Sequence, residues 1–177
     1  MSTWPKYPVI YEINTWVWLG ELCKKHQRSV NLATVPPEEW DRIACGGFDA
    51  VWFMGVWERS PAGIAISMRN QGLLTDFRRA LPDFAVDDNV GSPYCVRRYV
   101  VDEHLGGPDG LANAREKLAE RGLRLILDFV PNHVAPDHPW VSDHPEYFIQ
   151  GSVDDARRDP ASFIAAGDKV FTCGRDP

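Results

Sequence analysis

The sequence predicts an α/β fold with a parallel sheet, and three observations indicate it. Residues 48–56 and 123–129 are near-continuous apolar runs, which are typical of strands buried on both faces of a sheet. Each run follows a segment of helical character that ends in glycine, at Gly47 and at Gly122. The second run turns polar at Asp128. Because α/β folds bind ligands at the carboxyl ends of their parallel strands, this change of polarity marks a candidate site.

Composition and charge limit the classes of function that this chain can have. The chain has 177 residues, of which 44% are hydrophobic and 25% charged, enough for one domain with a core. Its net charge of −6 argues against a nucleic-acid partner. The apolar runs are too short to span a bilayer and residues 1–8 do not resemble a signal peptide, so no membrane partner is expected. The four cysteines form no Cys-x-x-Cys pair, and we expect reduced thiols and a cytoplasmic location.

The first third of the chain predicts a strand, a loop and a helix. Residues 9–15 mix β-branched and aromatic side chains and predict a first strand, with Glu12 and Asn14 on one face. A simple edge strand is the alternative for this segment. The basic residues 19–35 predict a solvated loop. Residues 36–40 then begin a helix, because proline and two acids suit a first helical turn.

The middle of the chain predicts an inserted helix, a turn and a second connecting helix. Residues 64–80 carry an apolar stripe and predict one amphipathic helix in the loop after the second strand. The run Gly-Ser-Pro-Tyr at residues 91–94 predicts a turn from which Tyr94 emerges. Residues 111–121 predict a helix that leads into the strand at residues 123–129.

The polar residues after the third predicted strand have a functional and a structural interpretation. Asp128, Asn132 and His133 place an acid, an amide and an imidazole where a ligand site is expected. The structural alternative is a capping acid, a turn residue and a core histidine, and on spacing alone both remain open. A zinc site of His133, His138 and His144 is a third alternative, but their spacing matches no standard zinc pattern.

The motif Asp128-Phe-Val-Pro-Asn132-His133 resembles the first signature region of the alpha-amylase family of glycoside hydrolases, which ends the third barrel strand. Residues 9–15 resemble the first barrel strand of that family, and residues 91–94 resemble a turn that the family often carries. Arg98 departs from the family, because many relatives carry Asp there, so the resemblance does not identify a linkage. The resemblance implies the N-terminal portion of a TIM (β/α)8 barrel over residues 1–177, with strands one to three and their intervening helices.

The resemblance also implies a chemistry and a role for each site residue. It implies hydrolysis or transfer at α-glucosidic bonds in carbohydrate metabolism, with an α-glucan or a small α-glucoside as partner. Tyr94 would stack beneath the sugar at the cleavage point, and His133 would donate a hydrogen bond to a sugar hydroxyl. Asp128 would brace an arginine near the nucleophile. Asn132 matches a position that often binds structural calcium, and no other cofactor is expected.

The length of the chain raises a second expectation. A (β/α)8 barrel needs about 200 residues or more. The family places its nucleophile, its acid and its third essential carboxylate after later strands, which would follow Pro177, and residues 134–177 would begin the excursion after strand three. We therefore expect a fragment that lacks its catalytic carboxylates, is inactive alone and has the rest of the barrel as a partner. The alternative is a non-catalytic sugar-binding or assembly module that keeps half of the pocket.

Overall fold

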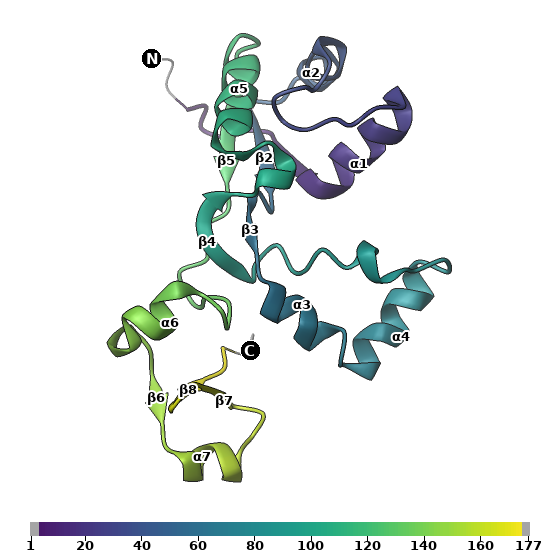
Figure 1. Cartoon of the computed structure of the whole chain (residues 1–177). Helices are drawn as coiled ribbons and strands as arrows, with labels where there is room; N and C mark the ends of the chain where they lie inside the picture. Colours follow the sequence, from purple (N-terminus) through teal and green to yellow (C-terminus); the bar gives the residue numbers. More distant parts are fainter. Residues whose placement is uncertain (1–3, 175–177) are drawn as a thin grey trace. The chain divides into compact units, whose positions relative to one another are not determined.

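The computed structural model describes residues 4–174, which divide into two compact units. Unit 1 comprises the chain up to Glu58 together with Tyr99–Phe129. Unit 2 comprises Arg59–Arg98 and the chain from Val130 onward. Figure 1 draws the whole chain, in which residues up to 58 and 99–129 form unit 1 and the other described residues form unit 2. No helix within residues 4–174 is long and apolar enough to cross a membrane.

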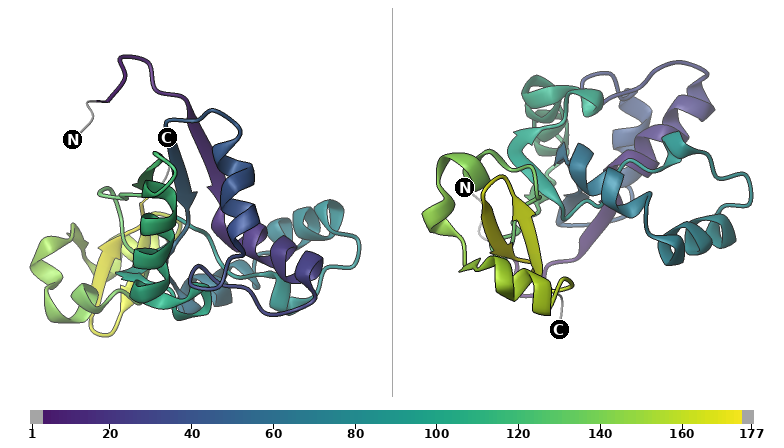
Figure 2. Two further views of the ribbon diagram at one scale, coloured as in Figure 1. Left: turned by 90° about the horizontal axis from the view of Figure 1, so that it is seen from above. Right: turned by 60° about the horizontal axis from the view of Figure 1, so that its bottom comes forward.

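The sheet of unit 1 is parallel, in the order β1-β2-β5. Its strands are β1 (Ile10–Asn14), β2 (Ala50–Met54) and β5 (Arg124–Leu127). Ile10 lies opposite Ala50, and Val51 lies opposite Leu125. The left panel of Figure 2 shows β1, in purple, beside β2, in dark blue, with both arrows in the same direction. The three predicted strands and their adjacent, parallel arrangement are confirmed.

Three helices pack around this sheet: α1 (Thr15–His26), α2 (Pro37–Ala44) and α5 (Gly107–Ala119). The loop predicted for residues 19–35 is therefore wrong in its first part, because α1 continues to His26. Asn14 caps this helix, with its side-chain oxygen 3.4 Å from the Val17 nitrogen. Leu19 and Leu22 are buried against the core, and the basic residues at the end of the helix complement its dipole.

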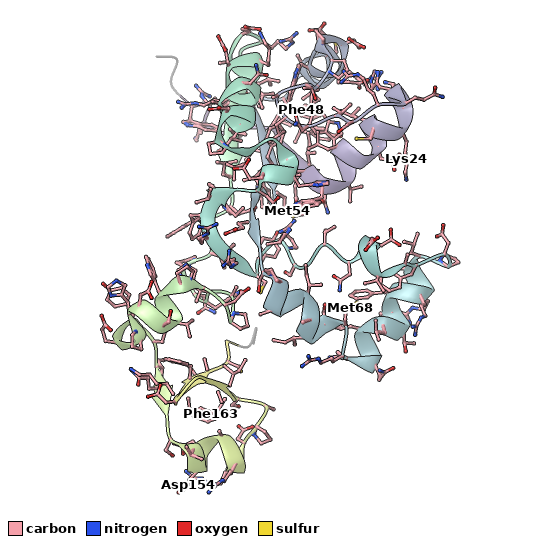
Figure 3. The ribbon with its side chains drawn as sticks, in the orientation of Figure 1. Lys24, Phe48, Met54, Met68, Asp154 and Phe163 are labelled. Atoms are coloured by element: carbon pink, nitrogen blue, oxygen red, sulfur yellow. The ribbon has the colours of Figure 1, made fainter. Side chains whose placement is uncertain are left out.

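The core of unit 1 gathers around β2. Phe53 is fully buried and Trp40 is 1% exposed, and their ring centroids lie 6.2 Å apart. Trp18 approaches both rings, at 5.9 Å from Phe53 and 5.4 Å from Trp40. In Figure 3, Phe48 and Met54 mark the two ends of the segment that carries Phe53. This aromatic packing explains why the second predicted strand is almost continuously apolar.

A buried acid joins α1 to α2. Glu39 is 3% exposed, and its carboxylate lies 2.5 Å from the Lys25 ammonium and 2.9 Å from the His26 ring. Arg42, one helical turn on, pairs with its other oxygen at 3.1 Å. Burial by itself would raise the pKa of Glu39, but the hydrogen bonds from Lys25 and His26 and the nearby charges outweigh burial and lower it.

Glu39 should give unit 1 a pH-dependent stability. Because its folded pKa lies below the ordinary value of 4.5, the unfolded chain binds this proton more tightly. The stabilisation is present above that value and is lost as the pH falls through the folded pKa. We expect Glu39→Gln to lower the free energy of unfolding at neutral pH by about 1–3 kcal/mol, measured by urea titration.

The control for this prediction is Glu38→Gln, an exposed acid in the same helical turn. It should change the free energy of unfolding by less than about 0.5 kcal/mol. The difference in free energy of unfolding between wild type and Glu39→Gln should also narrow as the pH falls below 4.5 and through the lower folded pKa of Glu39. A gap that stays constant with pH would show that the charge of Glu39 does not stabilise the unit.

Unit 2 begins with two helices where one was predicted. The helices are α3 (Pro61–Ser67) and α4 (Gln71–Ala80), so the single helix predicted over residues 64–80 is wrong. Asn70 explains the break, because its side-chain oxygen accepts from the nitrogens of Gly72 and Leu73 at 3.0 and 3.2 Å and caps a new helix. Figure 3 labels Met68 within this break.

The later part of unit 2 combines short helices with an antiparallel sheet in the order β6-β8-β7. Its elements are α6 (Pro139–Asp143), η3 (Pro145–Tyr147), β6 (Gln150–Gly151), α7 (Val153–Arg158), β7 (Phe163–Ala166) and β8 (Lys169–Thr172). Figure 3 labels Phe163 on β7 and Asp154 on α7. Two further strands, β3 (Trp57–Arg59) and β4 (Val96–Val101), pair with each other. Each of these strands contains a boundary between unit 1 and unit 2.

Candidate functional site

Asp128 directly follows β5 and is held by hydrogen bonds from the end of the neighbouring strand. It is 7% exposed. Its carboxylate accepts from the indole nitrogen of Trp52 at 2.8 Å and from the backbone nitrogen of Gly55 at 2.5 Å. Its backbone oxygen accepts from the indole nitrogen of Trp57 at 2.9 Å. Both carboxylate oxygens are therefore engaged, and the side chain links the carboxyl ends of β2 and β5.

Sequence reasoning missed the three donors around Asp128. Trp52 and Trp57 lie in or near the apolar run of residues 48–56, and the run does not single out their indole nitrogens. A signal was present, because a buried indole N–H usually finds an acceptor. Gly55 has a φ of +79°, a left-handed conformation that favours glycine and turns its N–H toward the carboxylate.

Exposed aromatic rings continue from this point in unit 1. Trp57 meets Tyr99 in an edge-on contact with ring centroids 5.2 Å apart, and Tyr99 meets Phe129 at 6.0 Å. Tyr99 is 42% exposed and Phe129 is 76% exposed. Aromatic faces of this kind can pack against the C–H face of a sugar ring, so they add a stacking surface that the sequence did not single out.

Unit 2 brings Tyr94 and His133 together. The Nε2 atom of His133 lies 3.1 Å from the backbone oxygen of Tyr94. Because a carbonyl oxygen only accepts, Nε2 is the donor in this contact. Tyr94 is 40% exposed. Gly174 packs against His133, since a Cβ at position 174 would lie 3.2 Å from the His133 Cβ.

Local structure explains the position of Tyr94. Gly91 has a φ of +84°, which favours glycine, and a Cβ there would meet Ile64 at 3.0 Å. The Ser92 hydroxyl accepts from the Tyr94 nitrogen at 3.2 Å. A backbone hydrogen bond from Ala135 to Val96, at 3.0 Å, ties the segments after Tyr94 and His133 together.

The three predicted site residues thus belong to two different units. Tyr94 and His133 lie in unit 2 and touch, whereas Asp128 lies in unit 1. The gathering of all three in one cleft stays a prediction. The role of His133 as a donor to a sugar hydroxyl also stays a prediction.

A zinc site of three histidines and a calcium ligand at Asn132 are the two metal-binding roles that the sequence suggests for this region. Asn132 is exposed. Within residues 4–174, no three histidine, cysteine or acidic side chains gather as a metal site would require. Calcium also binds amide and backbone carbonyl oxygens, so Asn132 as a calcium ligand stays a prediction, and no step is derived through it. His138 and His144 instead contact the Trp140 nitrogen and Glu146.

An ion-pair cluster holds the segment after His133 against α3. The Asp137 carboxylate accepts from the Ser60 hydroxyl at 2.6 Å and from the Ala62 nitrogen at 3.3 Å. Arg97 lies 3.6 Å from the same carboxylate. Burial raises the pKa of the neighbouring Cys95 thiol, which keeps it protonated and unsuited to act as a nucleophile. The cluster is structural, and it positions the chain on both sides of the Tyr94–His133 contact.

Comparison with known proteins decides the family. A family model described as the alpha-amylase catalytic domain matches residues 47–164, more than half of the chain. The chain belongs to the alpha-amylase family. The motif at residues 128–133 lies inside the matched segment, so the resemblance of that motif is confirmed at the level of the family.

The curated relatives that this chain matches are much longer than it is. An alpha-1,4-glucan:maltose-1-phosphate maltosyltransferase from Bifidobacterium longum is 30% identical over 131 residues, which cover 70% of this chain and 16% of that protein. The mouse amino acid transporter heavy chain SLC3A1 is 26% identical over 87 residues, which cover 49% of this chain and 12% of that protein. The chain thus spans about a sixth or less of the length of these relatives.

Solved structures of the alpha-amylase family share the fold. An alpha-amylase from Lactobacillus plantarum has a TM-score of 0.58 and 19% identity, over 93% of this chain and 31% of that one. A family GH13_31 enzyme has a TM-score of 0.63 and 18% identity, over 97% of this chain and 30% of that one. The predicted fold class is confirmed: the chain is α/β and forms the N-terminal portion of a (β/α)8 barrel.

Proposed function

We propose that this chain binds an α-glucan or a small α-glucoside, as part of an alpha-amylase family protein that hydrolyses or transfers glucosyl groups. The observation that carries the proposal is the contact between His133 and Tyr94, which sets an imidazole beside a half-exposed phenol ring. A pyranose needs such a pair, because its C–H face packs on an aromatic ring while its hydroxyls seek polar atoms. The relative from Bifidobacterium longum is named an alpha-1,4-glucan:maltose-1-phosphate maltosyltransferase, and this name supports an α-glucan as the ligand.

Asp128 enters the proposal as a positioning residue. Cleavage of a glycosidic bond normally needs two carboxyl groups that flank it. The two donors on Asp128, from Trp52 and Gly55, favour a carboxylate that braces its surroundings over one that attacks carbon. We therefore propose that the 177-residue chain binds sugar without cleaving it. Residues 134–177 would form the excursion after the third barrel strand, and the four free cysteines support a reducing, cytoplasmic setting.

The test is a titration of the 177-residue chain with maltotriose, in which the amide NMR signals of the chain report binding. We expect Tyr94→Ala to weaken binding by about tenfold, the loss of roughly one stacking contact. His133→Ala should weaken it similarly, and Tyr7→Ala, an exposed tyrosine of unit 1, should leave it unchanged. Release of reducing sugar from maltooligosaccharides should stay at the blank level. Unchanged binding in both site variants, or turnover by the wild-type chain, would contradict the proposal.

A second candidate function is a non-catalytic sugar-binding or assembly module. The observation that favours it is the fully engaged carboxylate of Asp128, together with the similarity to a transporter heavy chain. Both candidates predict binding without cleavage, so the genomic sequence after Pro177 discriminates them. An Arg-x-Asp strand end encoded there favours the enzyme, whereas a stop codon and a soluble, folded chain favour the module.

A further inference from the structure

A pocket of about 590 Å³ lies in unit 2, between the start of α6 and the turn that joins β7 to β8. We call it the hairpin pocket, and its lining includes Arg97, His138, Val141, Ser142, Asp168 and Lys169. The right panel of Figure 2 shows α6, in light green, beside the yellow hairpin. Its volume falls in the range of about 300–1,000 Å³ that is typical of small-molecule sites. Neither Tyr94 nor His133 lines it.

His138 provides the pocket with a hydrogen-bond donor. The residue is 7% exposed, and its Nδ1 accepts from the Trp140 nitrogen at 3.1 Å. Burial lowers the pKa of His138, so the ring is neutral near pH 7 and carries its proton on Nε2. Within residues 4–174 no partner is described for this Nε2–H, and Nε2 is not among the fully buried atoms that lack a partner. The N–H therefore remains accessible, and a ligand oxygen in the pocket can accept from it.

The charges of the pocket indicate an uncharged ligand. Arg97 lies 3.6 Å from the carboxylate of Asp137, which also lines the pocket. Asp168 and Lys169, in the hairpin turn, supply one charge of each sign. An anion would meet two carboxylates here, and a cation would meet an arginine and a lysine. A ring with several hydroxyl groups can donate to the acids and accept from the bases, and its C–H face can pack on Val141.

We propose that the hairpin pocket is a second sugar site, in which the Nε2–H of His138 donates to a hydroxyl of an uncharged glucosyl unit. The choice of a glucosyl unit rests on the proposed function, whereas the pocket itself does not. The site belongs entirely to unit 2, because all of its lining residues lie there. It would hold a neighbouring part of a glucan chain or a separate glucan, away from the Tyr94–His133 contact.

The decisive variant is His138→Asn in the full 177-residue chain. Asparagine keeps a side-chain oxygen that can accept from the Trp140 nitrogen, so the start of α6 stays capped. It is too short to present a donor where Nε2 lies. Maltotriose is the probe, and the amide signals of residues 166–169 report on the pocket. We expect binding there to weaken by about tenfold or more in His138→Asn.

Controls separate this inference from the proposed function. His144→Asn changes a nearby histidine that does not line the pocket, and it should leave the signals of residues 166–169 unchanged. His133→Ala should weaken the response at Tyr94 by about tenfold and spare the response at residues 166–169. The experiment can therefore contradict sugar binding at one of the two sites without contradicting it at the other.

Several results would overturn the inference. These are no saturable response at residues 166–169, a response that His138→Asn leaves intact, or an equal response to inorganic phosphate. If the Trp140 amide signal shows that His138→Asn has lost its cap, Lys169→Met replaces it as the test variant. Lys169→Met should weaken maltotriose binding at the same signals, and unchanged binding would overturn the inference equally.

Discussion

Replacing Asp128 with leucine should lower the free energy of unfolding of unit 1 by about 3–5 kcal/mol. The substitution leaves two donors, the Trp52 indole and the Gly55 amide, without the carboxylate that accepts from them at 2.8 and 2.5 Å. Each buried donor that loses its acceptor costs about 1–3 kcal/mol. A urea titration that follows the indole N–H signal of Trp52 measures the loss at the position where it arises.

Two further substitutions calibrate this result. Asp128→Asn keeps one acceptor oxygen, so it should cost about half as much as leucine. Asp109→Asn, at an exposed acid in the first turn of α5, should cost less than about 1 kcal/mol. If Asp128→Leu unfolds at the same urea concentration as the wild type, Asp128 does not hold the ends of β2 and β5 together.

Replacing Phe53 with alanine should destabilise unit 1 by about 3–5 kcal/mol. Phe53 is fully buried, and its ring centroid lies 5.9 Å from that of Trp18 and 6.2 Å from that of Trp40. The lost ring leaves a cavity that two rigid indoles cannot fill. The midpoint of urea unfolding, followed by tryptophan fluorescence, reports the change because both neighbours are fluorophores.

The matched control for Phe53 is Phe129, which is 76% exposed. Phe129→Ala should change the free energy of unfolding by less than about 1 kcal/mol, because little apolar surface is buried there. Phe53→Leu should lie between the two, at about 1–1.5 kcal/mol. Equal losses for Phe53→Ala and Phe129→Ala would show that the aromatic cluster around β2 does not form the core.

Local features of the sequence predicted part of the helical structure. Prolines and two acids marked the start of α2, which the structure confirms at Pro37. The pattern at residues 64–80 is amphipathic throughout, and the break between α3 and α4 depends on one capping side chain, Asn70. The basic end of α1 has the composition of a solvated loop, whereas Leu19 and Leu22 are buried at helical spacing. Capping and dipole effects are worth about 1 kcal/mol each, so a single residue can decide a helix boundary.

The sequence by itself determined the three parallel strands, their order and the family. Apolar runs, the glycines before them and the motif at residues 128–133 are local signals, and parallel strands joined by helices allow few arrangements. It also predicted which residues merit attention, namely Tyr94, Asp128 and His133.

Only the tertiary structure decided what those side chains contact. Asp128 accepts from donors 76 and 73 residues away, and His133 meets a backbone oxygen 39 residues away. The donor role of the His133 Nε2 atom follows from such a contact. A hydrogen bond depends on distance and angle between two groups, and for groups far apart in the sequence the folded chain alone sets both.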